Sequence, residues 1–221
     1  VSAAAGRLAS VRAIANGLVA LPRWNEEPSA PSLLAAASAS AMLAPYAADA
    51  ADDARTLSRA TAALQSLTRS STGLHYSRSS IAYADDDYVD LSLNALGLVV
   101  LRRLHLARVS VPRTLDTLGE QWRAALASGL VTTATRAIPR DATWRDAHML
   151  AEYRLALGAS WQPPPSTPSA VAAALSLDVV TAAVDQLSTY GKAAFALTLM
   201  LPANPTDDAY GAAWLGGARG S

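Results

Sequence analysis

The sequence contains no cysteine in its 221 residues. This absence excludes disulfide bonds, zinc or iron–sulfur sites that need cysteine ligands, and catalysis by a thiol nucleophile. Phenylalanine occurs once, so any core must be built from leucine, valine, alanine, tyrosine and tryptophan. The chain therefore depends on packing and hydrogen bonds rather than on covalent cross-links.

A net charge and a long hydrophobic run are missing as well. Eighteen basic and eighteen acidic residues cancel, so no basic excess is present to follow a nucleic-acid phosphate backbone. The apolar stretch 91–101 is ended by Arg102, well short of the roughly 20 residues that a membrane-spanning helix needs. Arg7 and Arg12 interrupt the apolar N-terminal stretch, which argues against a signal peptide. We expect neither a nucleic-acid partner nor a membrane span.

Hydrophobic residues make up 51% of the chain, and much of this share is alanine, the strongest helix former. Runs of β-branched residues bounded by turns are scarce, so the sequence predicts an all-α fold. The connectors favour antiparallel helical hairpins. We expect one helical domain over residues 1–202 and a flexible tail over residues 203–221. The expected helices cover about residues 3–21, 32–43, 52–67, 86–104, 112–127, 141–157, 168–187 and 188–201.

The spacing of apolar residues predicts how these helices pack. The stretch 86–104 is apolar nearly all round, so we expect it to be central. We expect residues 68–84 to be a serine-rich connector, Gly158 to cap a helix, and residues 160–168 to form a stiff proline-rich loop. The residues expected on buried faces are Leu8, Val11, Ile14 or Ala15, Leu18 and Leu21, then Ala60, Leu64 and Leu67, then Leu115, Leu118, Trp122 and Ala125 or Leu126.

An aspartate-rich motif is the sharpest local pattern. Asp86, Asp87 and Asp90 match the Asp-Asp-x-x-Asp motif that holds magnesium in isoprenoid synthases. Positions i and i+4 share a helix face, and carboxylates suit hard cations bound to diphosphate. The simpler interpretation is that acidic residues at a helix start cap free N–H groups and complement the helix dipole. Both interpretations stay open at this point.

The remaining chemistry-bearing side chains are dispersed. His75, His105 and His148 lie far apart in the sequence, whereas a zinc site needs three or four converging ligands. The sequence contains neither a Gly-x-Ser-x-Gly elbow nor a glycine-rich phosphate loop. Trp122 and Trp144 fall on expected buried helix faces, so we expect core roles for both.

Several segments, read in chain order, resemble the thioester domain of bacterial alpha-2-macroglobulins. Residues 13–22 (AIANGLVALP) resemble the helix that precedes the family's Pro-Tyr-Gly-Cys-x-Glu-Gln motif. The resemblance is collinear and extends from about residue 10 to about residue 202. Its other stretches are residues 62–67 (AALQSL) followed by Gly73, Leu74 and Tyr76, residues 88–103, Val111-Pro112, residues 144–158 and residues 187–201.

That family folds as an α/α toroid, so the resemblance implies helical hairpins in a complete or incomplete ring. Members with an intact motif carry a Cys–Gln thioester that traps proteases covalently. If Pro22 is aligned with the family proline, Asn25 replaces the cysteine. If Glu26 is aligned with the family glutamate, Trp24 replaces the cysteine and Glu27 the glutamine. In both alignments the sulfur is missing, so the resemblance implies a thioester-less member in which Trp24, Asn25, Glu26 and Glu27 are vestigial.

The resemblance further implies a non-enzymatic domain without a cofactor. Such a domain would dock against neighbouring domains or a protease, in the periplasm or cell envelope. One alternative is an enzyme similar to terpene cyclases or prenyltransferases that uses Asp86, Asp87 and Asp90 with magnesium. Another is a helical scaffold subunit of a larger assembly, which the alanine-rich helices and proline-rich loops suit.

Overall fold

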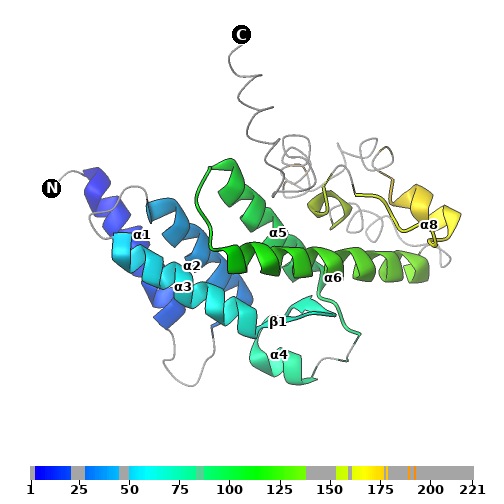
Figure 1. The fold of residues 1–221 in the computed structure, drawn as a ribbon, viewed down its shortest axis with the longest axis horizontal. Helices are drawn as coiled ribbons and strands as arrows, with labels where there is room; N and C mark the ends of the chain where they lie inside the picture. Colours follow the sequence, from blue (N-terminus) through cyan, green and yellow to red (C-terminus); the bar gives the residue numbers. More distant parts are fainter. Residues whose placement is uncertain are drawn as a thin grey trace, which may run out of the picture. The chain divides into compact units, whose positions relative to one another are not determined.

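A computed structural model of the chain (Figure 1) describes residues 3–20, 28–44, 50–83, 85, 87–137, 153–158, 161–176, 178, 189 and 192. Its contacts group into two compact units, unit 1 over residues 1–132 and unit 2 over residues 133–221. No boundary at this place was predicted from the sequence. The predicted domain over residues 1–202 stays a prediction, and the predicted tail lies outside the described residues.

Among the described residues of unit 1, the regular elements are helices and one short hairpin, which confirms the predicted all-α fold class. Helix α6 begins in unit 1, and its last residues belong to unit 2. The elements are α1 (Ala3–Ala20), α2 (Ala30–Leu43), α3 (Ala50–Ser66), β1 (Thr68–Arg69), β2 (Gly73–Leu74), α4 (Arg78–Tyr83), α5 (Leu91–Leu106) and α6 (Arg113–Ala137).

The first three helices begin and end within two residues of their predicted bounds. Three other predicted bounds were wrong. The helix predicted over residues 168–187 begins at Ser169 and ends at Ala174, and Leu175 is its C-cap. Helix α5 begins at Leu91 rather than at residue 86, because Asp90 is extended and its carboxylate accepts the Leu93 N–H as an N-cap. Helix α6 continues to residue 137, past the predicted end near 127, because Leu130 and Ala134 extend its buried face.

The interior of unit 1 is centred on α2, which packs against α1, α3 and α5 (Figure 1). Helix α5, which was expected to be central, packs on α2 and β2. Small alanine side chains let α2 approach its neighbours closely, so this helix is buried along its length. The buried residues of α2 are Ala30, Leu33, Leu34, Ala36, Ala37, Ser40, Ala41 and Leu43.

The predicted faces of α3 and α6 are buried, which confirms those expectations. Leu64 of α3 and Trp122 of α6 are fully enclosed. Glycine permits the close approach of α5 to α6, because a Cβ at Gly97 would lie 2.7 Å from Cε3 of Trp122. The other confirmed core residues of these faces are Ala60, Leu67, Leu115, Leu118, Ala125 and Leu126.

The predicted serine-rich connector contains the hairpin and α4. Strands β1 and β2 pair antiparallel, with Thr68 opposite Leu74 and Arg69 opposite Gly73. Gly73 has φ 74°, a left-handed conformation that favours glycine. A Cβ at this position would also collide with the Asn94 side chain of α5. The hairpin therefore depends on glycine for both its turn and its docking on α5.

The turn from α5 to α6 carries a residue in an unusual conformation. Arg108 has φ 54°, in the left-handed region that glycine normally occupies after a helix. Its N–H donates to the carbonyl of His105 at 2.9 Å, and the Val109 N–H donates to the carbonyl of Leu104 at 3.1 Å. This pair of bonds is the Schellman pattern that closes a helix C-terminus. Arg108 therefore occupies the glycine position of the motif.

The described part of unit 2 consists of the end of α6, helical residues 153–156, an extended loop and α8 (Ser169–Ala174). Gly158 follows the residues 153–156 with φ 96°, which confirms its predicted role at a helix end. The closing of hairpins into a ring stays a prediction. Among the described helices, none combines the length and apolar character needed to cross a bilayer.

Candidate functional site

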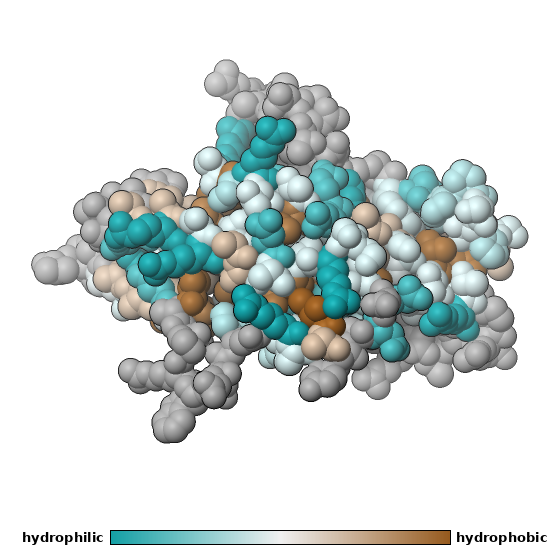
Figure 2. Space-filling model, turned by 60° about the horizontal axis from the view of Figure 1, so that its bottom comes forward, coloured by the Kyte–Doolittle hydropathy of each residue, from teal (hydrophilic) through white to brown (hydrophobic). Residues whose placement is uncertain are grey.

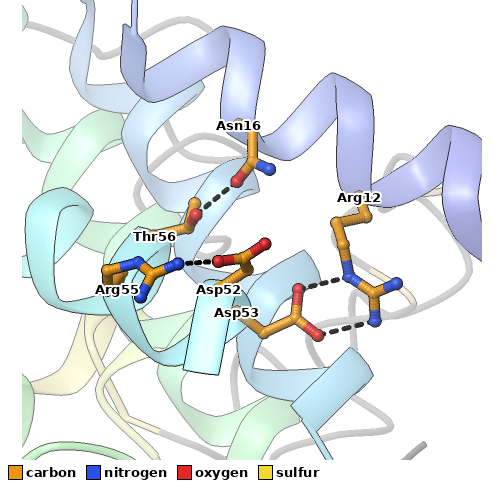
Figure 3. Close-up of polar contacts among 6 residues, drawn as sticks. All are labelled: Arg12, Asn16, Asp52, Asp53, Arg55 and Thr56. Carbon is orange, nitrogen blue, oxygen red and sulfur yellow. Dashed lines mark hydrogen bonds and ion pairs between the residues drawn. The ribbon is translucent and has the colours of Figure 1, made fainter. Parts of the chain in front are cut away.

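Side chains of α1 and α3 meet in a polar cluster (Figure 3). The Arg12 guanidinium of α1 donates from Nε and Nη2 to the two carboxylate oxygens of Asp53 in α3, each at 2.8 Å. One turn farther along α1, Asn16 Oδ1 accepts a hydrogen bond from the Thr56 hydroxyl of α3. We call these four residues the α1–α3 cluster. Its two bridges tie one face of α1 to α3.

Burial makes the Arg12–Asp53 pair the strongest contact of the cluster. The Asp53 side chain is 1% exposed and that of Arg12 is 17% exposed. The planar guanidinium matches the carboxylate with two parallel bonds, and Asp53 lies in the first turn of α3, where the helix dipole favours a negative charge. Asp52 and Arg55 form a neighbouring ion pair that is exposed to solvent, so it contributes little.

This geometry corrects the predicted buried face of α1. Ala15 is buried as expected, but Val11 is 43% exposed and Ile14 is 63% exposed. The helix is turned so that Arg12 and Asn16 point at α3 (Figure 3), which leaves the aliphatic side chains Val11 and Ile14 outside. The prediction failed because hydrophobic spacing alone does not reveal that α3 offers polar partners to Arg12 and Asn16.

A second polar network lies inside unit 1, between the hairpin and α5. Asn94 is fully buried, and its Oδ1 accepts the Leu74 N–H at 2.9 Å. Its amide nitrogen donates to the carbonyl of Asp90 at 2.8 Å and to that of Thr72 at 3.4 Å. The indole Nε1 of Trp122 donates to Thr68 Oγ1 at 3.0 Å. These bonds fix the hairpin on α5 and α6.

His75 follows β2 and is buried. Its Nε2 lies 2.8 Å from the hydroxyl of Thr72, with which it forms a hydrogen bond. Burial lowers the pKa of His75 most, the positive charge of Arg69 lowers it further, and Asp90 raises it in part. The imidazole is therefore held in its neutral form, and the folded unit resists its protonation.

The aspartate-rich motif does not lie on one helix. Asp90 caps α5, and Asp87 precedes the helix in an exposed turn. Asp87 and Asp90 therefore do not share a helix face, and the capping interpretation is confirmed for Asp90. Asp86 lies outside the described residues, so the predicted magnesium site of Asp86, Asp87 and Asp90 stays a prediction.

The predicted vestigial thioester region lies outside the described residues. This applies to Trp24, Asn25, Glu26 and Glu27, and its assignment stays a prediction. Trp144 also lies outside them.

Within the described ranges, no three histidine, aspartate or glutamate side chains gather as metal ligands would. His105 Nε2 lies 3.0 Å from Asp116 Oδ1, which joins the last turn of α5 to the first turn of α6.

The described part of unit 2 contains a buried arginine. Arg154 is fully enclosed, and its three nitrogens donate to main-chain carbonyls of Leu175, Gly158 and Trp161 at 2.7 to 2.8 Å. Burial lowers the pKa of Arg154 to about 10. The guanidinium therefore stays charged at neutral pH and acts as a three-way clamp on the main chain. No pattern in the sequence indicated this role.

Comparison with known proteins identifies no relative of this chain: no protein family, curated protein or solved structure matches it. The resemblance to alpha-2-macroglobulin thioester domains therefore stays a prediction from sequence segments. The structure defines an all-α protein in which an ion pair with a buried carboxylate joins two helices of the first unit.

Proposed function

We propose that the chain is a non-enzymatic helical domain that binds another protein, and that α1 supplies the docking surface. The docking surface is the stripe of exposed Val11 and Ile14 with half-buried Leu18, which recur at helical spacing along α1. One observation carries the proposal: α1 turns its half-buried polar residues Arg12 and Asn16 toward α3 and exposes Val11 and Ile14. A helix folded only for its own unit's stability is expected to show the opposite arrangement.

The surroundings of the stripe support this inference. Single exposed hydrophobic residues are common on soluble proteins, and on the face drawn in Figure 2 the hydrophobic areas are separated by hydrophilic residues. Val11 and Ile14 differ because they are neighbours on a helix that the buried ion pair holds in this rotation. Burying one such side chain contributes on the order of 1.5 to 3 kcal/mol, so the stripe can supply the centre of a modest interface.

The proposal agrees with a thioester-less alpha-2-macroglobulin-like domain that docks on a neighbouring domain or on a protease. Such a domain acts without covalent capture, because the chain has no cysteine to form the thioester. Incubation with a panel of proteases should give no conjugate that survives boiling in detergent. Covalent adducts whose yield falls in the presence of small amines would contradict this part of the proposal.

Photo-crosslinking in the native host tests the docking surface. A photoreactive side chain at position 14 should give a discrete protein adduct, and the same group at exposed Arg59 of α3 should not. Adding Val11→Asp to the position-14 variant should remove the adduct while far-UV circular dichroism stays unchanged, because Val11 is partly in solvent. Equal labelling at positions 14 and 59, or none at position 14, would overturn the proposal.

A further inference from the structure

Unit 2 contains a proline-rich loop that is largely exposed to solvent. Residues 161–168 read Trp-Gln-Pro-Pro-Pro-Ser-Thr-Pro. Gln162, Pro164 and Pro165 are exposed and Pro163 is half-buried. A residue that precedes proline is restricted to extended conformations, and the proline ring fixes its own φ. The sequence therefore biases the stretch 162–164 toward polyproline II geometry.

The start of this loop is anchored by Arg154. Its Nη2 donates to the Trp161 carbonyl at 2.8 Å, and its guanidinium carbon lies 5.0 Å from the centre of the Trp161 ring. Both a hydrogen bond to a charged donor and a cation–π contact therefore fix Trp161. The same guanidinium holds the carbonyls of Gly158 and Leu175, so the loop is fastened to both flanking segments of unit 2.

The end of the loop is anchored by a turn. The Thr167 N–H donates to the Pro164 carbonyl at 2.9 Å, which places Pro165 and Ser166 at the centre of a β-turn. Proline is favoured at the first central position of such turns. Helix α8 begins directly after Pro168, whose carbonyl accepts the Ala172 N–H at 2.9 Å. The loop is thus fixed at both ends, with the prolines between them.

We propose that residues 162–164 are a preorganised ligand for a partner domain that reads polyproline II segments in an aromatic-lined groove. Such domains gain affinity from a ligand that is already in the bound conformation, since little entropy is lost on binding. Trp161 is turned onto Arg154 and positions the segment rather than contacting the partner. This inference concerns unit 2 and does not rest on the role proposed for α1.

A binding experiment with the full chain tests the ligand. Isotope-labelled SH3, WW and EVH1 domains, each validated with its own proline peptide, are titrated with the unlabelled chain and followed by NMR. At least one domain should show shifts at its groove aromatics that its own peptide reverses. Pro163→Ala combined with Pro164→Ala should weaken this binding roughly tenfold. Ser166→Ala, in the adjoining turn, should leave it unchanged.

The anchoring by Arg154 is tested separately. Arg154→Lys keeps the charge but cannot reach three carbonyls at once, so it should bind the same domain more weakly than the parent chain. If this variant does not fold, a synthetic peptide of residues 160–169 replaces it in the test. The peptide lacks the anchor of Arg154 and should bind several-fold more weakly than the intact chain. Three results would overturn the inference: no domain responds, the double proline variant binds as well as the parent, or the peptide matches the intact chain.

Discussion

The packing of α5 against α6 makes a quantitative prediction about one glycine. A Cβ added at Gly97 would lie 2.7 Å from Cε3 and 3.0 Å from Cζ3 of Trp122. The indole cannot withdraw freely, because it is fully buried and its Nε1 is bonded to Thr68 at 3.0 Å. Gly97→Ala must therefore displace Trp122 or separate the two helices.

The expected magnitude follows from opposing terms. Replacing glycine by alanine in a helix gains about 1 kcal/mol of helix propensity. Overpacking of a core costs about 1 to 3 kcal/mol, and straining the Trp122–Thr68 hydrogen bond costs about 1 kcal/mol more. Gly97→Ala should therefore lower the free energy of unfolding by about 1 to 3 kcal/mol. Gly17→Ala in α1 is the matched control, because its Cβ would meet nothing within 4 Å, and it should stabilise by about 0.5 to 1 kcal/mol.

Urea unfolding followed by far-UV circular dichroism measures both free energies from the shift in midpoint at a common slope. Hydrogen exchange at the Trp122 indole gives a local readout, because displacement of the ring frees its N–H from Thr68. Exchange should accelerate in Gly97→Ala and stay unchanged in Gly17→Ala. If Gly97→Ala proves as stable as the parent protein, the close approach of α5 to α6 is refuted.

Three further changes test other parts of unit 1. Asp53→Asn leaves Arg12 without its buried counter-charge and should lower the free energy of unfolding by about 2 to 3 kcal/mol. The loss is smaller than for a fully buried pair because Arg12 is partly exposed. The control Asp52→Asn, in an exposed pair, should lower it by less than about 1 kcal/mol in the same urea assay. Because the folded state lowers the pKa of His75 from 6.5, with Arg69 and Asp90 as its charged neighbours, the unfolded chain binds the proton more readily. The stability of the parent protein should therefore fall as the pH drops below about 6.5. In a pH series of thermal melts, His75→Gln should reduce this loss. If the variant and the parent protein show the same pH profile, the role of His75 is refuted. Arg108→Gly should stabilise by about 0.5 to 1 kcal/mol, because it relieves a left-handed arginine, and a lower melting temperature would argue against the Schellman turn.

Helix positions and most buried faces could be predicted because they depend on local chemistry. Prolines and apolar spacing indicated α2 and α3 to within two residues, and the spacing of Leu115, Leu118 and Trp122 indicated the core face of α6. The start of α5 was misplaced because acidic residues suit both the interior of a first turn and the cap before it. The N-cap bond of Asp90 separates these alternatives. This bond depends on the local backbone conformation of Asp90, which the composition of the segment does not reveal.

The polar contacts could not be predicted because their partners are distant in sequence. Asp53 lies 41 residues after Arg12, and Asn94 lies 20 residues after Leu74. Arg154 reaches Leu175, which is 21 residues away. One weak signal was present, since Arg12 and Asn16 are four apart on an alanine-rich helix and therefore share a face. Such a pair inside an apolar pattern indicates a buried polar partner on another helix.

The rotation of α1 connects this energetic point to function. If hydrophobic burial alone set the rotation, Val11 and Ile14 would face α2 and α3 and add several kcal/mol of transfer free energy. Burying Arg12 and Asp53 as a pair is at best neutral relative to apolar packing. The observed rotation therefore does not maximise the stability of unit 1. A partner protein that covered Val11 and Ile14 would recover this burial, and this is the reason why we propose α1 as the protein-binding surface.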